Sequence, residues 1–371
     1  MDVTGLVART ATRRVHVFLV ETPGFGLLRM LAQAAIAERG WVEALGPADA
    51  DALVVCGTPS SQLDRLIDAV WQQIPSPRHR VLLEPGGSLN DLLNSIPAVL
   101  RDDPRQRTDA RTRRLVLDDD RGPAPAVTPH GDDAGSGAGM DPGMEMDMDM
   151  DMDMSGPAGI PLAGGDNDRD GLEMDVTHLT MGPLLAEWPA DLVLHCSLHG
   201  DVVVDARAEL LPWPDNIEQP PEAARLLDDA ARLLSVAGWE PAAQQLARLR
   251  DDVLAGGTVD RLLPRLRRVA SRLRRSRSLR WSLSGLPQTP GTPLRARLLD
   301  WVQTVLDLVD PALVDPDAVD PAQQIPAADL RRPTSPDDIR LAVIGQELAA
   351  TRLIIAGLGS RSRVSGSVSH E

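Results

Sequence analysis

Apolar and polar positions divide the chain into two parts with different periods. In the first part, up to residue 100, short apolar runs alternate with stretches of helical spacing. Strands are predicted at residues 15–20, 41–45, 52–56 and 80–84, and helices at residues 27–37, 62–73 and 89–95. Strands and helices that alternate through such short connections are typical of a parallel sheet with helices on its faces. The first part is therefore predicted to be a doubly wound, flavodoxin-like α/β domain.

The second part changes from strand-like to helix-like spacing. Residues 191–197 and 202–208 are apolar at alternate positions, and Gly200-Asp201 between them is a hairpin turn. From residue 219 the spacing becomes helical. Helices are predicted at residues 220–240, 241–257, 259–273, 293–309 and 335–358. Their short connections predict a β-hairpin that leads into a helical bundle.

Residues 101–170 follow neither period. They are rich in Asp, Arg, Pro and Gly, and they contain the tract MDPGMEMDMDMDMDM at residues 140–154. Such a composition buries too little apolar surface to offset the entropy of ordering. The predicted organisation is an α/β domain at residues 1–100, a disordered linker at 101–170, a β-hairpin region at 171–214, a helical bundle at 215–359 and a disordered tail at 360–371.

Composition narrows the functional classes. The 371 residues carry a net charge of −16, which argues against a protein that binds nucleic acid over its whole surface. Two cysteines cannot form a disulfide framework or ligate an iron–sulfur cluster. No run of 18 apolar residues predicts a membrane span. The first residues lack the apolar core of a signal peptide, so we expect a cytoplasmic location.

Glycine- and proline-rich loops follow three of the predicted strands. In an open α/β sheet such loops line the ligand crevice. The candidate crevice residues are Gly24, Gly26, Gly57, Thr58, Glu84, Gly86 and Gly87. The first loop lacks the third glycine of a dinucleotide fingerprint, and no Gly-Lys-Ser/Thr motif occurs. Structural turns are the preferred interpretation, with a small-ligand site as the alternative.

One predicted helix is strongly basic in an otherwise acidic chain. Residues 261–280 contain nine arginines and also one apolar face, so the helix is expected to pack in the bundle. The interaction candidates are Arg267, Arg268, Arg272, Arg274 and Arg275. Acidic protein, anionic lipid, nucleic acid and the chain's own Met-Asp tract are possible partners. Few aromatic residues lie nearby, so we favour a protein or a self-contact over nucleic acid.

Two groups of residues raise the question of metal binding. Thioethers are soft ligands that suit Cu(I), which makes Met146, Met148, Met150, Met152 and Met154 candidates. The tract contains no histidine, and a solvated acidic tether is the preferred interpretation. His195 and His199 would lie about 13 Å apart on a strand, too far to share one ion. They are expected on its wetter face, together with His178, while Cys196 belongs to the apolar face.

A family resemblance adds to these patterns. Residues 51–83, DALVVCGTPSSQLDRLIDAVWQQIPSPRHRVLL, resemble the strand, helix and Pro-containing turn of the cluster-bearing small subunit of respiratory complex I and nickel–iron hydrogenases. The segment from Gly182-Pro183 to Val203 is similar to the opening β-region of the large subunit of the same family. The chain thus looks like a fusion of both subunits.

The departures from that family determine the expected function. The loops at residues 22–26 and 85–88 carry no thiolate, Cys56 stands alone, paired Cys-x-x-Cys motifs are missing, and the chain has no tyrosine for a quinone site. The resemblance then implies a structural or assembly subunit that binds no cofactor and no iron–sulfur cluster. Its partners would be other subunits of a membrane-associated complex I-like assembly at the inner face of the membrane. Copper or nickel handling, and small-ligand binding, are the alternatives.

Overall fold

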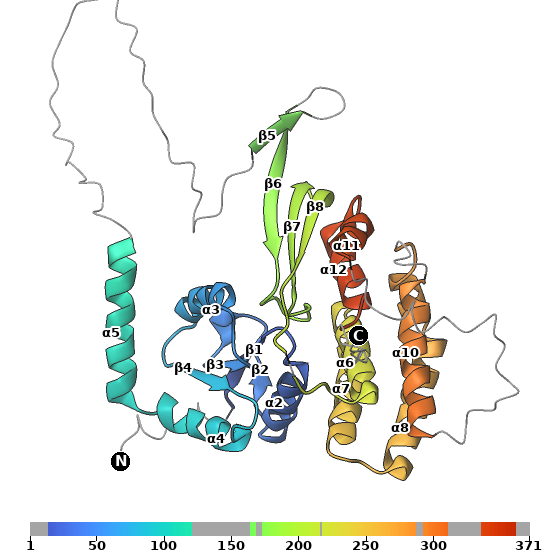
Figure 1. The fold of residues 1–371 in the computed structure, drawn as a ribbon, viewed down its shortest axis with the longest axis horizontal. Helices are drawn as coiled ribbons and strands as arrows, with labels where there is room; N and C mark the ends of the chain where they lie inside the picture. Colours follow the sequence, from blue (N-terminus) through green and yellow to red (C-terminus); the bar gives the residue numbers. More distant parts are fainter. Residues whose placement is uncertain are drawn as a thin grey trace, which may run out of the picture.

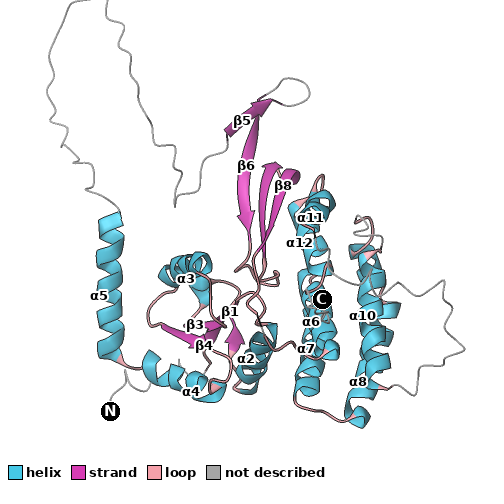
Figure 2. Ribbon diagram, in the orientation of Figure 1, coloured by secondary structure: helices cyan, strands magenta, loops and turns pink. Residues whose placement is uncertain are grey.

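The computed structural model describes residues 14–120, 164–167, 173–215, 217–286, 292–310 and 335–360. These residues form two lobes (Figure 1). The first lobe contains residues 14–120 and is built on a parallel sheet. The second contains the described residues from 164 onward, with an antiparallel sheet followed by helices (Figure 2). The mixed α/β class predicted from the sequence is confirmed.

The sheet of the first lobe has four parallel strands in the order β2-β1-β3-β4. The strands are β1 (His16–Glu21), β2 (Val42–Glu43), β3 (Ala52–Cys56) and β4 (His79–Leu83). Every residue of β3 is buried, as expected for a central strand covered on both faces. The strand order reverses between β1 and β3, which makes their carboxyl ends the switch point where open α/β sheets usually bind ligands.

Helices cover both faces of this sheet. They are α2 (Gly26–Glu38), α3 (Ser61–Gln73) and α4 (Leu89–Leu100), with a 3₁₀ turn at Pro47–Asp49. The cluster that contains Ala32, Ile36 and Ile96 joins α2 and α4 to one face. A second cluster joins α3 to the other face through Leu63 and Ile67. Alternate residues of β1 and β3 enter the two clusters, which explains the continuous apolar runs of these two strands.

The predicted disorder is wrong at the start of the linker, where Asp103–Asp120 forms helix α5. The Gln106 side chain accepts a hydrogen bond from the Arg78 backbone N–H at 2.9 Å, and Arg78 also pairs with Asp109 at 2.7 Å. These polar contacts hold a helix that has little apolar surface. Composition reports apolar burial alone, so it does not predict a helix that polar contacts stabilise. The Met-Asp tract lies outside the described residues.

The antiparallel sheet of the second lobe has the order β5-β6-β7-β8. Its strands are β5 (Gly164–Asn167), β6 (Glu173–Met181), β7 (Leu192–His199) and β8 (Val202–Leu210). The predicted hairpin is β7–β8, and two further strands extend it. Leu192, Leu194 and Cys196 are buried as predicted, in a cluster shared with the two last helices.

The remaining helices form the predicted bundle. They are α6 (Glu222–Val236), α7 (Glu240–Leu254), α8 (Val259–Arg275), α9 (Arg277–Ser282), α10 (Leu294–Val309), α11 (Pro336–Val343) and α12 (Leu348–Gly357). The prediction of one final helix is wrong, because Gly345 has φ 78° and the chain there bridges Glu347 to Val202 of β8. The break lets α11 and α12 cover the sheet while α12 also joins the bundle. Among the described residues, no helix is long and apolar enough to cross a membrane.

Candidate functional site at the junction of the two lobes

The switch point of the parallel sheet is filled by a side chain of the first lobe. Glu21 and Cys56, the last residues of β1 and β3, lie side by side in the sheet register. The loop after β1 turns back, and Thr22 donates a hydrogen bond from its hydroxyl to the Cys56 carbonyl at 2.8 Å. A Cβ atom at Gly57 would overlap the ring of Phe25, which is itself buried. Phe25 therefore occupies the place that a bound ligand would need.

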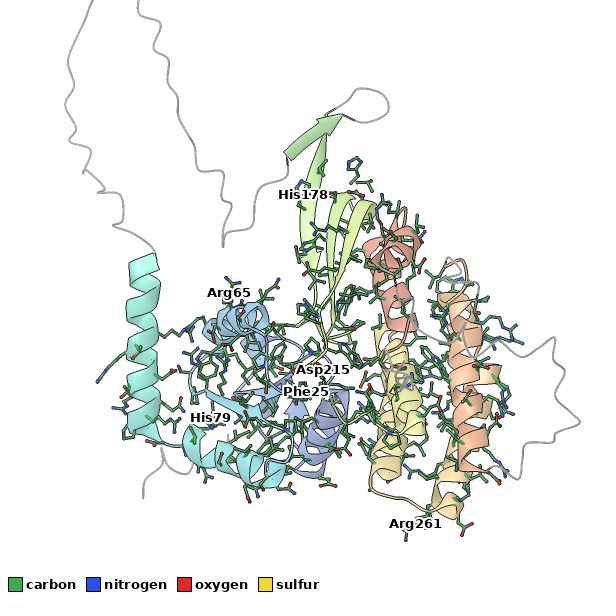
Figure 3. The ribbon with its side chains drawn as sticks, in the orientation of Figure 1. Phe25, Arg65, His79, His178, Asp215 and Arg261 are labelled. Carbon is green, nitrogen blue, oxygen red and sulfur yellow. The ribbon has the colours of Figure 1, made fainter. Side chains whose placement is uncertain are left out.

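The segment between β8 and α6 covers this loop from the second lobe. A Cβ atom at Gly24 would lie 2.5 Å from Ile217 and 3.6 Å from Trp213. Trp213 is anchored because its indole N–H donates to the Asp191 carboxylate at 3.1 Å. Figure 3 labels Phe25 and Asp215 where the two lobes meet. The small-ligand crevice, which is the alternative interpretation of these loops, is closed at this strand end.

Buried ion pairs lie directly beside the closed crevice and connect the lobes. The Asp228 carboxylate of α6 pairs with Arg29 of α2, with Arg250 of α7 at 2.6 Å and with Arg232 at 3.1 Å. Glu21 completes the group by accepting from both Arg29 and Arg232, the latter at 2.8 Å. We call these five residues the junction cluster.

The electrostatics of the junction cluster favour its charged form. Burial alone would raise the pKa of Asp228, but the guanidiniums of Arg29, Arg232 and Arg250 outweigh it and hold this pKa well below its usual range. Burial opposes the charge on Arg29 as well, yet Asp228 and Glu21 raise its pKa. A carboxylate this deeply buried is stable only while its cations stay in place.

A small polar cavity lies next to the cluster. The space open to water is about 50 Å³, and its walls include Glu187, Asp229 and Arg225. Asp229 pairs with Arg225 at 3.2 Å and accepts from the Ser360 backbone N–H at 2.9 Å. Burial raises the pKa of Glu187, whose backbone has φ 59°. A cavity of this size holds a few waters, far below the roughly 300–1,000 Å³ of small-molecule sites.

The structure separates the predicted crevice residues. Gly24 and Gly26 line the cavity at the junction, and Gly57 lies under Phe25. The other four, Thr58, Glu84, Gly86 and Gly87, are exposed and do not line this cavity. The Glu84 carbonyl accepts a hydrogen bond from the Gly87 N–H at 3.0 Å, which makes that loop a structural turn.

Sequence reasoning missed the junction cluster entirely. The available signal was in α6, where two adjacent carboxylates interrupt the run LLDDAARLL. Charged residues between leucines on a helix that must bury most of its surface require partners. Nothing in the sequence indicates that one of these partners, Arg29, lies on α2, 199 residues before Asp228.

The thiols and histidines of the described residues are not arranged as a metal site. Burial raises the pKa of the Cys56 thiol, and that of Cys196 to about 11. His178 and His195 are exposed as predicted and hydrogen-bond to Ser197 and Thr180. No group of three His, Cys, Asp or Glu side chains in the described part of the chain can hold a metal ion. The candidate methionines lie outside the described residues.

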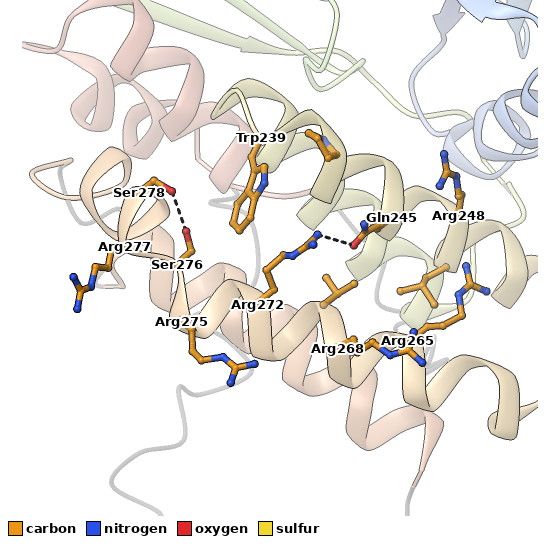
Figure 4. Close-up of a pocket in the computed structure, with 13 residues that line it drawn as sticks. Trp239, Gln245, Arg248, Arg265, Arg268, Arg272, Arg275, Ser276, Arg277 and Ser278 are labelled. Carbon is orange, nitrogen blue, oxygen red and sulfur yellow. Dashed lines mark hydrogen bonds between the residues drawn. The ribbon is translucent and has the colours of Figure 1, made fainter.

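The five candidate arginines of α8 fall into two sets. Arg268, Arg272 and Arg275 line an open groove between α7 and α8 (Figure 4). Arg267 and Arg274 instead contact α10 or its end, through Asp310 at 3.8 Å and Gln303 at 2.5 Å. The sequence identified the basic helix correctly but did not distinguish its two faces.

Comparison with known proteins adds no candidate chemistry to these sites. The chain matches no family model, no curated protein and no solved structure.

Proposed function

We propose that this chain is a structural or assembly subunit, in which the junction cluster joins the two lobes into one platform for partner subunits. The observation that carries the proposal is the Asp228 carboxylate, buried between Arg29 from the first lobe and Arg232 and Arg250 from the second. Separating the lobes would break the Arg29–Asp228 and Arg232–Glu21 ion pairs, which both cross the junction. The two lobes are therefore expected to act together.

The closed switch point of the parallel sheet supports a structural role. Phe25 fills the switch point, and Trp213 and Ile217 cover it from outside. The 50 Å³ cavity that remains is lined by charged side chains that already pair with one another. These features favour a structural role over small-ligand binding at this edge, where an open crevice would be needed.

The proposed partners are subunits of a membrane-associated, complex I-like or hydrogenase-like assembly that moves electrons or protons. This part of the proposal is based on the resemblance of residues 51–83 and of the segment from Gly182 onward. The chain itself would supply contacts rather than electron carriers, because the loops at residues 22–26 and 85–88 have no thiolate.

Affinity purification of the full chain from its native membranes tests the proposal. We expect membrane subunits of an ion-translocating assembly, identified by mass spectrometry, to co-purify in a fixed ratio. The Asp228→Ala chain should lose them, whereas Asp252→Ala, which removes a half-exposed carboxylate of α7, should keep them. Stoichiometric iron and acid-labile sulfide in the purified chain would contradict the structural role. Copper retained only while the Met-Asp tract is intact would instead favour metal handling.

A further inference from the structure

The groove between α7 and α8 is open and positively charged. Its volume is about 1090 Å³, larger than most small-molecule sites. Part of its lining is apolar and comes from Trp239, Pro241, Leu249 and Val269. The charged side chains that line it are Arg248, Arg265, Arg268, Arg272, Arg275 and Arg277, and no carboxylate is among the lining residues.

Most of these arginines have no counter-charge within the part of the chain that the structure describes. Arg265 pairs with Asp252 at the edge of the groove. Arg272 donates to the Gln245 amide oxygen at 3.3 Å, and Arg275 donates to the Ser271 carbonyl of its own helix. These are neutral acceptors, so the positive charge remains. Like charges gathered in one groove attract a polyanion from several ångströms away.

We propose that the acidic tract at residues 140–154 of the same chain binds in this groove. The tract carries six carboxylates and no cation, which complements a groove with no lining carboxylate and with five arginines that have no described acidic partner. Guanidinium groups bind carboxylates through paired, charge-assisted hydrogen bonds. The alternating methionines complement the apolar lining, because thioether side chains adapt to irregular surfaces such as those around Trp239 and Leu249.

The length of the intervening chain permits this contact. Between Asp120, the end of α5, and Gly164, the start of β5, lie 43 residues. Asp147 in the middle of the tract is 17 residues before Gly164, and 17 residues span up to about 56 Å.

The covalent connection between the tract and the groove favours the tract over anions that are not part of the chain. A segment on the same chain is present at an effective concentration on the order of millimolar, without any loss of free diffusion. Nucleic acid would meet the same arginines, but it would also meet the chain's net charge of −16. Binding of the tract in the groove does not require the proposed structural function.

A peptide competition experiment tests the proposal on the full chain. The probe is a fluorescent peptide with the sequence of residues 140–154, followed by anisotropy at 50 mM salt. One chain is wild type, and the second carries D141N, E145Q, D147N, D149N, D151N and D153N, which neutralise the tract. We expect the neutralised chain to bind the peptide at least tenfold more tightly than wild type, because its groove is vacant.

Two variants of equal charge change locate the site on α8. In the neutralised chain, R268Q/R275Q removes groove arginines and is expected to weaken peptide binding at least tenfold. R267Q/R274Q removes two arginines from the α10 side of the same helix and is expected to change binding less than threefold. Circular dichroism melting curves establish that both variants are folded.

Three results would overturn the proposal. Equal peptide affinity of the wild-type and neutralised chains would mean that the tract does not occupy the groove. Equal weakening by R267Q/R274Q and R268Q/R275Q would mean that binding follows total charge and not the groove. A concentration-dependent dimer that R268Q/R275Q dissolves would mean that the tract binds a second copy instead of its own chain.

Discussion

Arginine has opposite roles at the junction of the lobes and in the groove of the bundle. At the junction, Arg29 and Arg250 are buried and each contacts carboxylates, so their charges are neutralised within the fold. In the groove, Arg268 and Arg275 are exposed and have no described carboxylate as partner. Arg250, Arg268 and Arg275 lie on helices of the second lobe, and Arg29 lies on α2 of the first lobe. Arginines that pair with buried carboxylates therefore stabilise the fold, whereas arginines without a described carboxylate partner are available to bind an anionic segment.

The largest expected effect is the loss of the central carboxylate of the junction. Asp228→Ala leaves three guanidiniums buried without their shared partner, and we expect the free energy of unfolding to fall by about 3–5 kcal/mol. Urea denaturation at neutral pH measures the change. The matched control is Asp252→Ala in α7, whose partner Arg265 is half exposed. It is expected to cost about 0–1 kcal/mol. Equal costs for the two variants would mean that burial of the junction does not matter.

Titration of Asp228 provides a second test of the junction. Its pKa is lower in the folded chain than the value of about 3.9 in unfolded chains, so its contribution to stability is complete above about pH 5. The contribution is lost as pH falls through the lowered pKa. The stability difference between wild type and Asp228→Asn should therefore be constant from pH 5 to 7 and shrink below pH 4. Urea midpoints measured at half-unit steps of pH provide the curve.

Other buried carboxylates near the junction cluster change the pH dependence of stability in the opposite direction. Burial raises the pKa of Asp229 and of Glu187, so these groups favour the folded state less as pH rises above about 4. Both are present in wild type and in Asp228→Asn, and subtracting the two curves removes most of their effect. A difference that grows toward low pH would contradict the assignment of Asp228 as the charged centre.

The switch point that Phe25 fills leads to a prediction of an intermediate loss of stability. Gly57 has φ 89° and lies against Phe25, whereas Gly86 has φ 78° and an added Cβ would meet nothing within 4 Å. Gly86→Ala therefore measures backbone strain alone, which costs about 1 kcal/mol. Gly57→Ala adds displacement of the Phe25 ring and is expected to cost about 2–3 kcal/mol more. Chemical denaturation of both variants is the measurement. Similar costs would mean that Phe25 moves freely and that the crevice can open.

Elements whose pattern is local were predictable from the sequence. The four parallel strands follow from apolar runs such as residues 52–56, and the buried face of β7 follows from the alternation of Leu192, Leu194 and Cys196. The basic helix was identified for the same reason, because nine arginines beside a regular apolar face are visible in one window.

Contacts between distant segments were not predictable. Arg29 and Asp228 are separated by 199 residues, and neither position reveals its partner. Helix α5 was missed because its stabilising contacts, Arg78 with Asp109 and with Gln106, are polar and come from another element. The small-ligand alternative for these loops stayed open because the approach of Phe25 to Gly57 and of Ile217 to Gly24 arises only in the folded chain. One sequence without an alignment contains no signal for such pairs.

The smallest expected effect is the most specific test of the groove, because it predicts a change of sign. In the chain with a neutralised tract, R268Q/R275Q removes unmatched like charges and should raise the free energy of unfolding by about 0.3–0.5 kcal/mol at low salt. In wild type the same variant should lower it by a similar amount, because the acidic tract loses its partners. The four chains form a double-mutant cycle, measured by urea denaturation at 50 mM and 500 mM salt. High salt should shrink both effects, since exposed charges are screened. The same sign in both backgrounds would mean that the groove arginines and the tract do not interact.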